Sequence, residues 1–200
     1  MTLPRSKRPG GNPVLGIEQL YETAIRALAR RARSSGQMRE LLRKRKGGKS
    51  EIEAVVQRLK ENGYLDDARF ARFFVAARLE NDLHGPARVR RDLAARRVKP
   101  EIAEAALQRG YQAVDEGLLL RDYLRRKVRL SRPLNKPSAV AALYRRLLRA
   151  GFRSDTIVRE LKRLLGGSLY QAPAATEPVR WDELLDSLPE TPEPESEPRA

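Results

Sequence analysis

Residues 63–93 of the chain read GYLDDARFARFFVAARLENDLHGPARVRRDL. This pattern is typical of a helix end, a turn and a second helix. Gly63 can adopt the left-handed conformation that closes a helix, and Asp66 or Asp67 can cap the next helix by accepting hydrogen bonds from its free amide groups. Three phenylalanines then follow three and four residues apart, and we expect them on one buried face of that helix: Phe70, Phe73 and Phe74.

A further helix boundary lies at Gly85-Pro86, eight residues before the end of this stretch. Proline is well tolerated in the first turn of a helix, so a new helix is expected to begin at Pro86. Val89 and Leu93 would form its inner face. The arginines between them would point away from the core: Arg88, Arg90 and Arg91. The stretch therefore predicts short helices and an all-α fold.

The composition limits the class of protein. The 200 residues include no cysteine, which excludes disulfides, thiolate catalysis and zinc–thiolate sites. No apolar run has the length of a membrane span, and residues 2–12 lack the apolar segment of a secretory signal. We therefore expect a soluble, cytoplasmic protein.

The charge of the chain is strongly positive and uneven. Residues 1–14 carry +3, residues 15–165 carry +18 and residues 166–200 carry −6, which together give the formal charge of +15. Such a body attracts polyanions over about one Debye length, roughly 8 Å at physiological salt. Nucleic acid or an acidic protein groove is the expected partner. The alternative is a basic protein whose charge serves solubility alone.

Apolar positions recur along the chain and indicate an internal repeat. The equivalent positions are expected to be Met38, Val89 and Tyr144, then Leu42, Leu93 and Leu148, then Ile52, Ile102 and Ile157. Ser50, Lys99-Pro100 and Ser154 precede the third helix of each repeat, and Ser50 with Glu53 forms a predicted capping box. Three tandem three-helix units are expected, each too small to be stable alone and each stacked on its neighbours.

The expected boundaries follow from this repeat. A disordered basic arm covers residues 1–16, the three units cover 17–63, 64–110 and 111–166, and a disordered acidic tail covers 167–200. Trp181, Leu184, Leu185 and Leu188 in the tail have helical spacing, which indicates a possible short helix over 179–188. It would either dock on the chain's own core or bind a partner.

Basic side chains gather on the polar faces of the expected helices. Arginine can bind phosphate or carboxylate groups through two parallel hydrogen bonds, so these faces are the candidate binding surface, with plain solvation as the alternative. Arg43 and Lys44 can also offset a helix dipole. The candidate residues are Arg43, Lys44, Arg88, Arg90, Arg91, Arg97, Arg121, Arg125, Arg129, Arg145, Arg146 and Arg149. Residues 131–138, SRPLNKPS, are expected to form a loop before the last two helices.

The sequence offers no set of residues that would make an active site. The segment KGGKS (46–50) lacks the earlier glycine of a phosphate-binding loop and follows an expected helix instead of a strand. His84 is the only histidine and is expected in a turn. Asp66 and Asp67 could suggest Mg²⁺, but helix capping accounts for them. No cofactor, metal site or enzymatic activity is expected.

The central motif resembles that of the RecX family, bacterial regulators of RecA. The resemblance spans about residues 20–165 in order, and Gly151-Phe152 with Ile157 extends it toward the end of that range. The residues of the central motif are Gly63, Tyr64, Leu65, Asp66, Asp67, Arg69, Phe70, Gly85 and Pro86.

The resemblance implies a long, curved body of tandem three-helix repeats. It implies a monomer without enzymatic activity that binds in the groove of the RecA filament on single-stranded DNA and contacts the DNA phosphate backbone. Such a protein would hinder filament growth or promote disassembly, and so restrain recombination, the filament's ATPase and the co-protease activity of the SOS response. A stand-alone nucleic-acid-binding helical protein stays open as the alternative.

Overall fold

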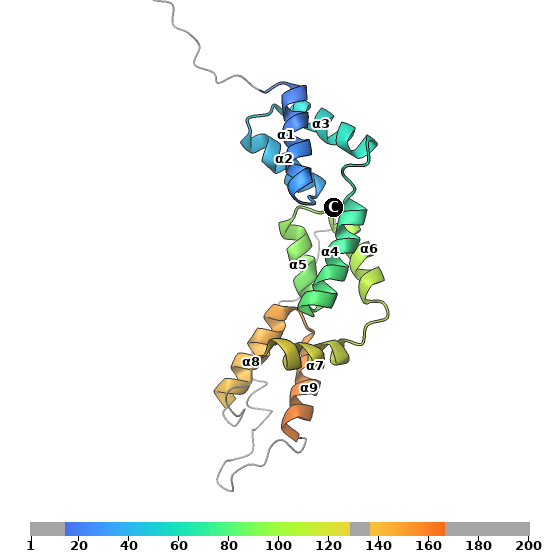
Figure 1. Ribbon diagram of the computed structural model, residues 1–200. Coiled ribbons are helices and arrows are strands. Elements are labelled where there is room, and N and C mark those ends of the chain that lie inside the picture. The colour runs from blue at the N-terminus through green and yellow to red at the C-terminus, as the bar shows by residue number, and fades with distance from the viewer. Residues whose placement is uncertain (1–14, 129–136, 167–200) are drawn as a thin grey trace, which may run out of the picture.

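The computed structural model describes residues 15–128 and 137–166, and within these ranges the chain is helical and contains no strand. The predicted all-α fold is confirmed. The elements are α1 (Ile17–Arg30), α2 (Ser35–Lys44), α3 (Lys49–Glu61), α4 (Asp67–Ala77), a π-helical turn η1 (Arg78–Asp82), α5 (Pro86–Ala95), α6 (Pro100–Tyr111), α7 (Glu116–Lys127), α8 (Pro137–Ala150) and α9 (Ser154–Gly166). They form an elongated body with α1–α3 at one end, α4–α6 in the middle and α7–α9 at the other end (Figure 1).

Each of these three groups of helices has its own buried apolar cluster. Leu20, Leu42 and Leu59 are among the buried residues of the first group, Val75 and Leu93 of the second. Leu120, Leu147, Ile157 and Leu161 are buried in the third, together with Leu83 from the loop before α5. We propose that these groups are the repeat units, with the boundaries expected from the sequence, because each cluster draws almost all its members from one trio.

The loop between the second and third helices has the same backbone conformation in all three groups. Its left-handed residues are Lys46, Arg97 and Gly151, with φ of 61°, 57° and 96°. The amide of each donates to the carbonyl three residues earlier, at 2.9, 2.8 and 3.0 Å. The next amide donates five residues back, to Leu42, Leu93 and Leu147. This is the hydrogen-bond pattern of a helix closed by one left-handed residue.

These loops correct the register expected for the repeat. In the third group, the position equivalent to Leu42 and Leu93 is Leu147 instead of Leu148. Leu147 is fully buried. The same loops place Leu143 instead of Tyr144 in line with Val89, one residue earlier than expected, and Ala103 instead of Ile102 in line with Ile52, one residue later. The prediction was wrong by one residue because Tyr144, Leu148 and Ile102 are also apolar and lie next to the true equivalents.

Consecutive groups are joined by contacts between main-chain segments. The hydroxyl of Ser34, just before α2, donates to the carbonyl of Arg96, just after α5. In the next joint the amide of Gly85, just before α5, donates to the carbonyl of Ala150 at the end of α8 (2.9 Å). In both joints, therefore, the start of the second helix of one group meets the second loop of the following group.

The starts of the helices differ in part from expectation. Asp66 caps α4 by accepting a hydrogen bond from the amide of Arg69 (2.8 Å), as predicted. The capping box predicted at Ser50 is wrong, because α3 begins at Lys49 after Gly48 and the Ser50 hydroxyl contacts only the neighbouring carboxylate of Glu51. The capping box of the first group belongs to α2, where Ser34 pairs with Gln37. Helix α1 ends at Arg30.

The three phenylalanines of α4 do not form a buried face. Phe73 is 70% exposed, and Phe70 and Phe74 are half-buried. The buried side of α4 consists of Ala71 and Val75, whose small size lets the helix lie close against α6. The prediction of a buried Phe73 was wrong because helical spacing alone does not say which face of a helix meets the core.

Candidate nucleic-acid interface

Half of the candidate cations are engaged by acids. The distances are 3.2 Å for Arg88–Asp92, 2.5 Å for Arg90–Glu104, 3.0 Å for Arg97–Glu40, 2.7 Å for Arg121–Glu160, 2.8 Å for Arg125–Asp122 and 3.1 Å for Lys44–Glu40. At these six positions the basic faces are therefore interrupted by carboxylates.

The acidic partners often come from a different helix, where a pattern along one helix cannot show them. Glu104 of α6 meets Arg90 of α5, and the hydrogen bond from Arg90 lowers the pKa of the Glu104 carboxyl. The pKa of Glu40 is lowered by the hydrogen bonds from Lys44 and from Arg97. A phosphate that bound these arginines would have to compete with a carboxylate already in place.

The arginines of α8 have no such partner within the described residues. The side chains of Arg145 and Arg149 are exposed and make no hydrogen bond or ion pair there. Arg146 donates to the carbonyl of Lys127 (2.5 Å), and Arg91 of α5 donates to the carbonyl of Arg149 (3.1 Å). These four residues are called the α8 arginine face below. No carboxylate of residues 15–128 or 137–166 pairs with these charges, so this face is the strongest anion-binding candidate among the predicted positions.

Two candidates lie apart from this face. Arg43 near the end of α2 is exposed and makes no ion pair with the described residues. Arg129 lies outside the described residues, as do most of the expected loop at 131–138 and the acidic tail with its expected helix over 179–188. The structure therefore brings Arg91, Arg145, Arg146 and Arg149 together, and it leaves Arg43 at the other end of the body.

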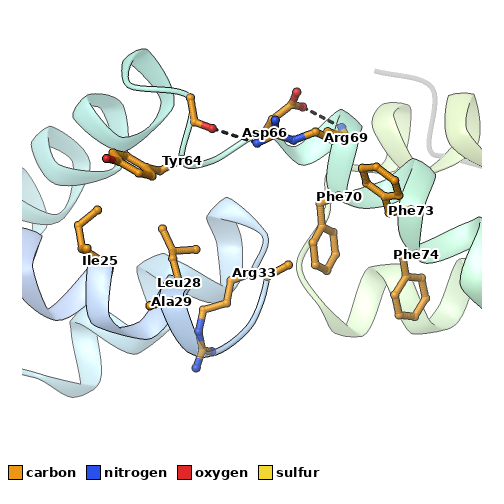
Figure 2. A pocket seen from close by; sticks show the side chains of 12 residues that line it. Ile25, Leu28, Ala29, Arg33, Tyr64, Asp66, Arg69, Phe70, Phe73 and Phe74 are labelled. Atoms are coloured by element: carbon orange, nitrogen blue, oxygen red, sulfur yellow. Dashed lines mark hydrogen bonds between the residues drawn. The ribbon is translucent and has the colours of Figure 1, made fainter.

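Sequence reasoning missed an apolar groove between α1 and α4, called the α1–α4 groove below (Figure 2). It has a volume of about 630 Å³ and is lined by Ile25, Leu28, Ala29, Ala32, Arg33, Gly63, Tyr64, Asp66, Arg69, Phe70, Phe73 and Phe74. More than half of these residues belong to the 63–74 segment, which carries most of the central motif. The exposed Phe73 and Tyr64 are the signal that could have identified the groove, had their exposure been recognised.

Other chemistry is limited in the part of the chain that the structure describes. It contains no group of three or more histidine, cysteine or acidic residues placed to hold a metal ion. The KGGKS segment forms the joint between α2 and α3. His84 lies in the turn before α5, where its carbonyl accepts a hydrogen bond from the hydroxyl of Tyr111 (2.6 Å). Among the described helices, none is both long enough and apolar enough to cross a membrane.

Comparison with known proteins agrees with this architecture. Residues 21–59 match the family described as RecX, first three-helix domain, and residues 66–107 match RecX, second three-helix domain. A regulatory protein RecX of Escherichia fergusonii is 34% identical over 137 residues, which are 64% of this chain and 77% of that protein. The chain belongs to the RecX family of regulatory proteins. A RecX protein of Thermus thermophilus is 40% identical over 105 residues, 52% of this chain and 70% of the relative.

Other RecX proteins differ in how much of their length is matched. A relative from Photobacterium profundum is 36% identical over 81 residues, which are 40% of this chain and only 30% of that protein. The crystal structure of RecX from Lactobacillus salivarius aligns with a TM-score of 0.59 and 20% identity over 74% of this chain and 96% of that one. At this identity the alignment shows a shared RecX fold, and the family places the chain among regulatory proteins.

Proposed function

We propose that this chain regulates RecA by binding in the groove of the RecA filament on single-stranded DNA. There it limits filament growth or promotes disassembly, and so restrains recombination and the SOS-type co-protease activity. The observation that carries the proposal is the exposed α8 arginine face on an elongated RecX-family body. We also propose that the chain acts as a cytoplasmic monomer.

The shape and the charge support this function together. A row of helix groups, each contacting mainly the next, can touch several subunits of a filament at once, and weak contacts made simultaneously add to a strong one. Arg91, Arg145, Arg146 and Arg149 would contact phosphates or acidic side chains of the filament. The ion-paired cations would contribute less, because an existing pair must open first.

A titration into RecA assembled on single-stranded DNA tests the proposal. ATP hydrolysis by the filament is expected to fall as the protein is added. The length of DNA covered by RecA should shorten in parallel. If hydrolysis stays constant at saturating protein while free DNA is bound tightly, the chain is instead a stand-alone nucleic-acid-binding protein. The uncompensated arginines on α8 would fit that second function equally well.

A further inference from the structure

The α1–α4 groove presents two aromatic rings to solvent. Tyr64 is 55% exposed and Phe73 is 70% exposed, and they reach the groove from the loop before α4 and from α4 itself (Figure 2). The other two rings are engaged in packing. Phe70 and Phe74 stack at 6.1 Å, and the guanidinium groups of Arg78 and Arg96 lie over the Phe74 ring. Tyr64 and Phe73 are therefore the rings with surfaces available to a ligand.

Cations border this groove on both sides. Arg33, from the segment after α1, and Arg69 of α4 are the basic residues in its lining. Asp66, the acid in the lining, is engaged in capping α4 through the amide of Arg69. The groove therefore combines an apolar floor with positively charged edges.

Arg33 connects this groove to a second, basic hollow. The hollow has a volume of about 490 Å³ and is lined by Arg31, Arg33, Gln37, Glu40, Leu41, Lys44 and Arg45. Glu40, the acid in that lining, is held by Lys44 and by Arg97 from the next group. The buried Nε of Arg33 has no hydrogen-bond partner among the described residues, and burial, reinforced by Arg31, lowers the pKa of its guanidinium. Arg33 is therefore the cation shared by the groove and the basic hollow.

We propose that the α1–α4 groove binds unpaired bases of single-stranded DNA. Tyr64 and Phe73 stack on the bases, while Arg33 and the basic hollow hold the adjoining phosphates. This combination of aromatic platforms and a cationic track is how proteins bind single strands without reading their sequence. The inference rests on the proposed function, since it adds a base-binding site to a protein whose target filament contains single-stranded DNA.

The exposed rings favour bases over an apolar helix as the occupant. An amphipathic helix inserts its side chains into a recessed apolar groove, whereas Phe73 projects from α4 with most of its surface in water. A single strand supplies a flat ring and a negative charge with every nucleotide. The groove supplies two projecting rings, Tyr64 and Phe73, together with the lining arginines Arg33 and Arg69, which matches that alternation.

The test compares two oligonucleotides that have the same phosphates. The full chain is titrated, by fluorescence anisotropy, against labelled oligothymidine and against an abasic oligonucleotide of equal length. The unchanged chain should prefer oligothymidine. Phe73→Ala and Tyr64→Ala should each weaken oligothymidine binding about 5- to 150-fold, the range expected for one stacked base. Each variant should retain the salt dependence and reduce the preference over the abasic strand.

Three further variants serve as controls. Leu118→Ala removes another exposed apolar side chain, 56% exposed on α7, and should change neither affinity. Phe73→Tyr keeps an aromatic ring and should keep the preference for bases. Arg33→Gln should weaken binding to both strands and reduce the slope of log K against log salt by about 0.7, the value for one neutralised phosphate on a single strand.

Equal binding of the two oligonucleotides by the unchanged chain would overturn the inference. It would also fail if Phe73→Ala bound both strands normally but lost affinity for RecA without DNA, because the groove would then be a protein-binding site. If the chain represses filament ATP hydrolysis but shows no preference for bases, the proposed function stands and the base-binding site is rejected. If the chain prefers bases but leaves filament ATP hydrolysis unchanged, the base-binding site stands and the regulation of RecA is rejected.

Discussion

Gly85 and Gly151 lie so close together that neither position has room for a side chain. A Cβ atom on Gly85 would stand 2.2 Å from the carbonyl oxygen of Gly151, and one on Gly151 would stand 2.3 Å from the amide nitrogen of Arg88. The φ of 96° at Gly151 is also a conformation that other residues adopt only with strain. The joint between the middle and last helix groups thus depends on two missing side chains.

Gly85→Ala is expected to lower the free energy of unfolding by about 1–3 kcal/mol, the usual cost of forcing an extra methyl group into a packed site. Urea denaturation measures the change. Gly16→Ala is the matched control, because nothing lies within 4 Å of a Cβ there. If the two variants were equally stable, the fold would not require the close approach of Gly85 to Gly151.

Ser34→Ala is expected to destabilise the protein by about 1–2 kcal/mol, since it removes the α2 cap and also leaves the carbonyl of Arg96 without this donor. Ser50→Ala, at the position where the sequence predicted the cap, should stay within about 0.5 kcal/mol of the unchanged chain. Thermal unfolding followed by circular dichroism separates the two. The reverse order would restore the predicted box at Ser50.

The sequence was sufficient for the all-α fold, because glycine, proline and capping residues act locally. Gly63 is left-handed (φ 71°) and Pro86 starts α5, as their chemistry requires. What failed was the choice between adjacent apolar residues, as at Leu147 and Leu148. Both fit a helical period, and only the packing of α8 on its neighbours decides which one is buried.

The candidate site was less predictable than the fold. Arg90 and Glu104 are fourteen residues apart and on different helices, so their pairing depends on how α5 and α6 pack. Charge along one helix could not distinguish Arg90 from Arg145, although one is neutralised and the other is not. The α1–α4 groove was missed for a similar reason, because Phe73 was assigned to the core by its spacing.

Replacing Arg145, Arg146 and Arg149 by glutamine should weaken DNA binding and reduce its salt slope by up to about 2, because each phosphate neutralised on a single strand contributes about 0.7 to that slope. The matched control replaces the ion-paired Arg90, Arg97 and Arg125 by glutamine, which changes the net charge equally. It should reduce the slope less. Equal slopes for the two triple variants would mean that net charge alone governs binding.

His84 should make stability fall as the pH drops below about 6.5, the pKa of histidine in an unfolded chain. Burial lowers the pKa of His84 in the folded protein, with Arg88 and Arg78 acting in the same direction and Asp82 and Asp92 opposing it. Below pH 6.5 the unfolded chain therefore binds a proton that the folded chain does not.

His84→Gln should remove this loss of stability between pH 6.5 and the lowered folded pKa. Carboxyl groups with lowered pKa values, such as that of Glu104, lose their contribution only nearer pH 4. Urea denaturation at pH 7.5 and pH 5.5 measures the difference. An unchanged pH dependence in the variant would assign the effect to another group.

Cutting the chain after Gly166 should raise its affinity for DNA. The removed segment is acidic, and residues 166–200 carry −6 beside a body of +18. Its loss leaves a more positive protein, which should bind more tightly at low salt and differ less at high salt. Anisotropy titrations at two salt concentrations test this, and equal or lower affinity would reject screening by the tail.

The joint at Gly85 also bears on the curvature of the elongated body. A few main-chain atoms there set the angle between the middle and the last helix groups. Because the body is long, a small rotation at this joint produces a large displacement of its far end. Substitutions at these glycines would thus change the curvature of the body without altering any arginine.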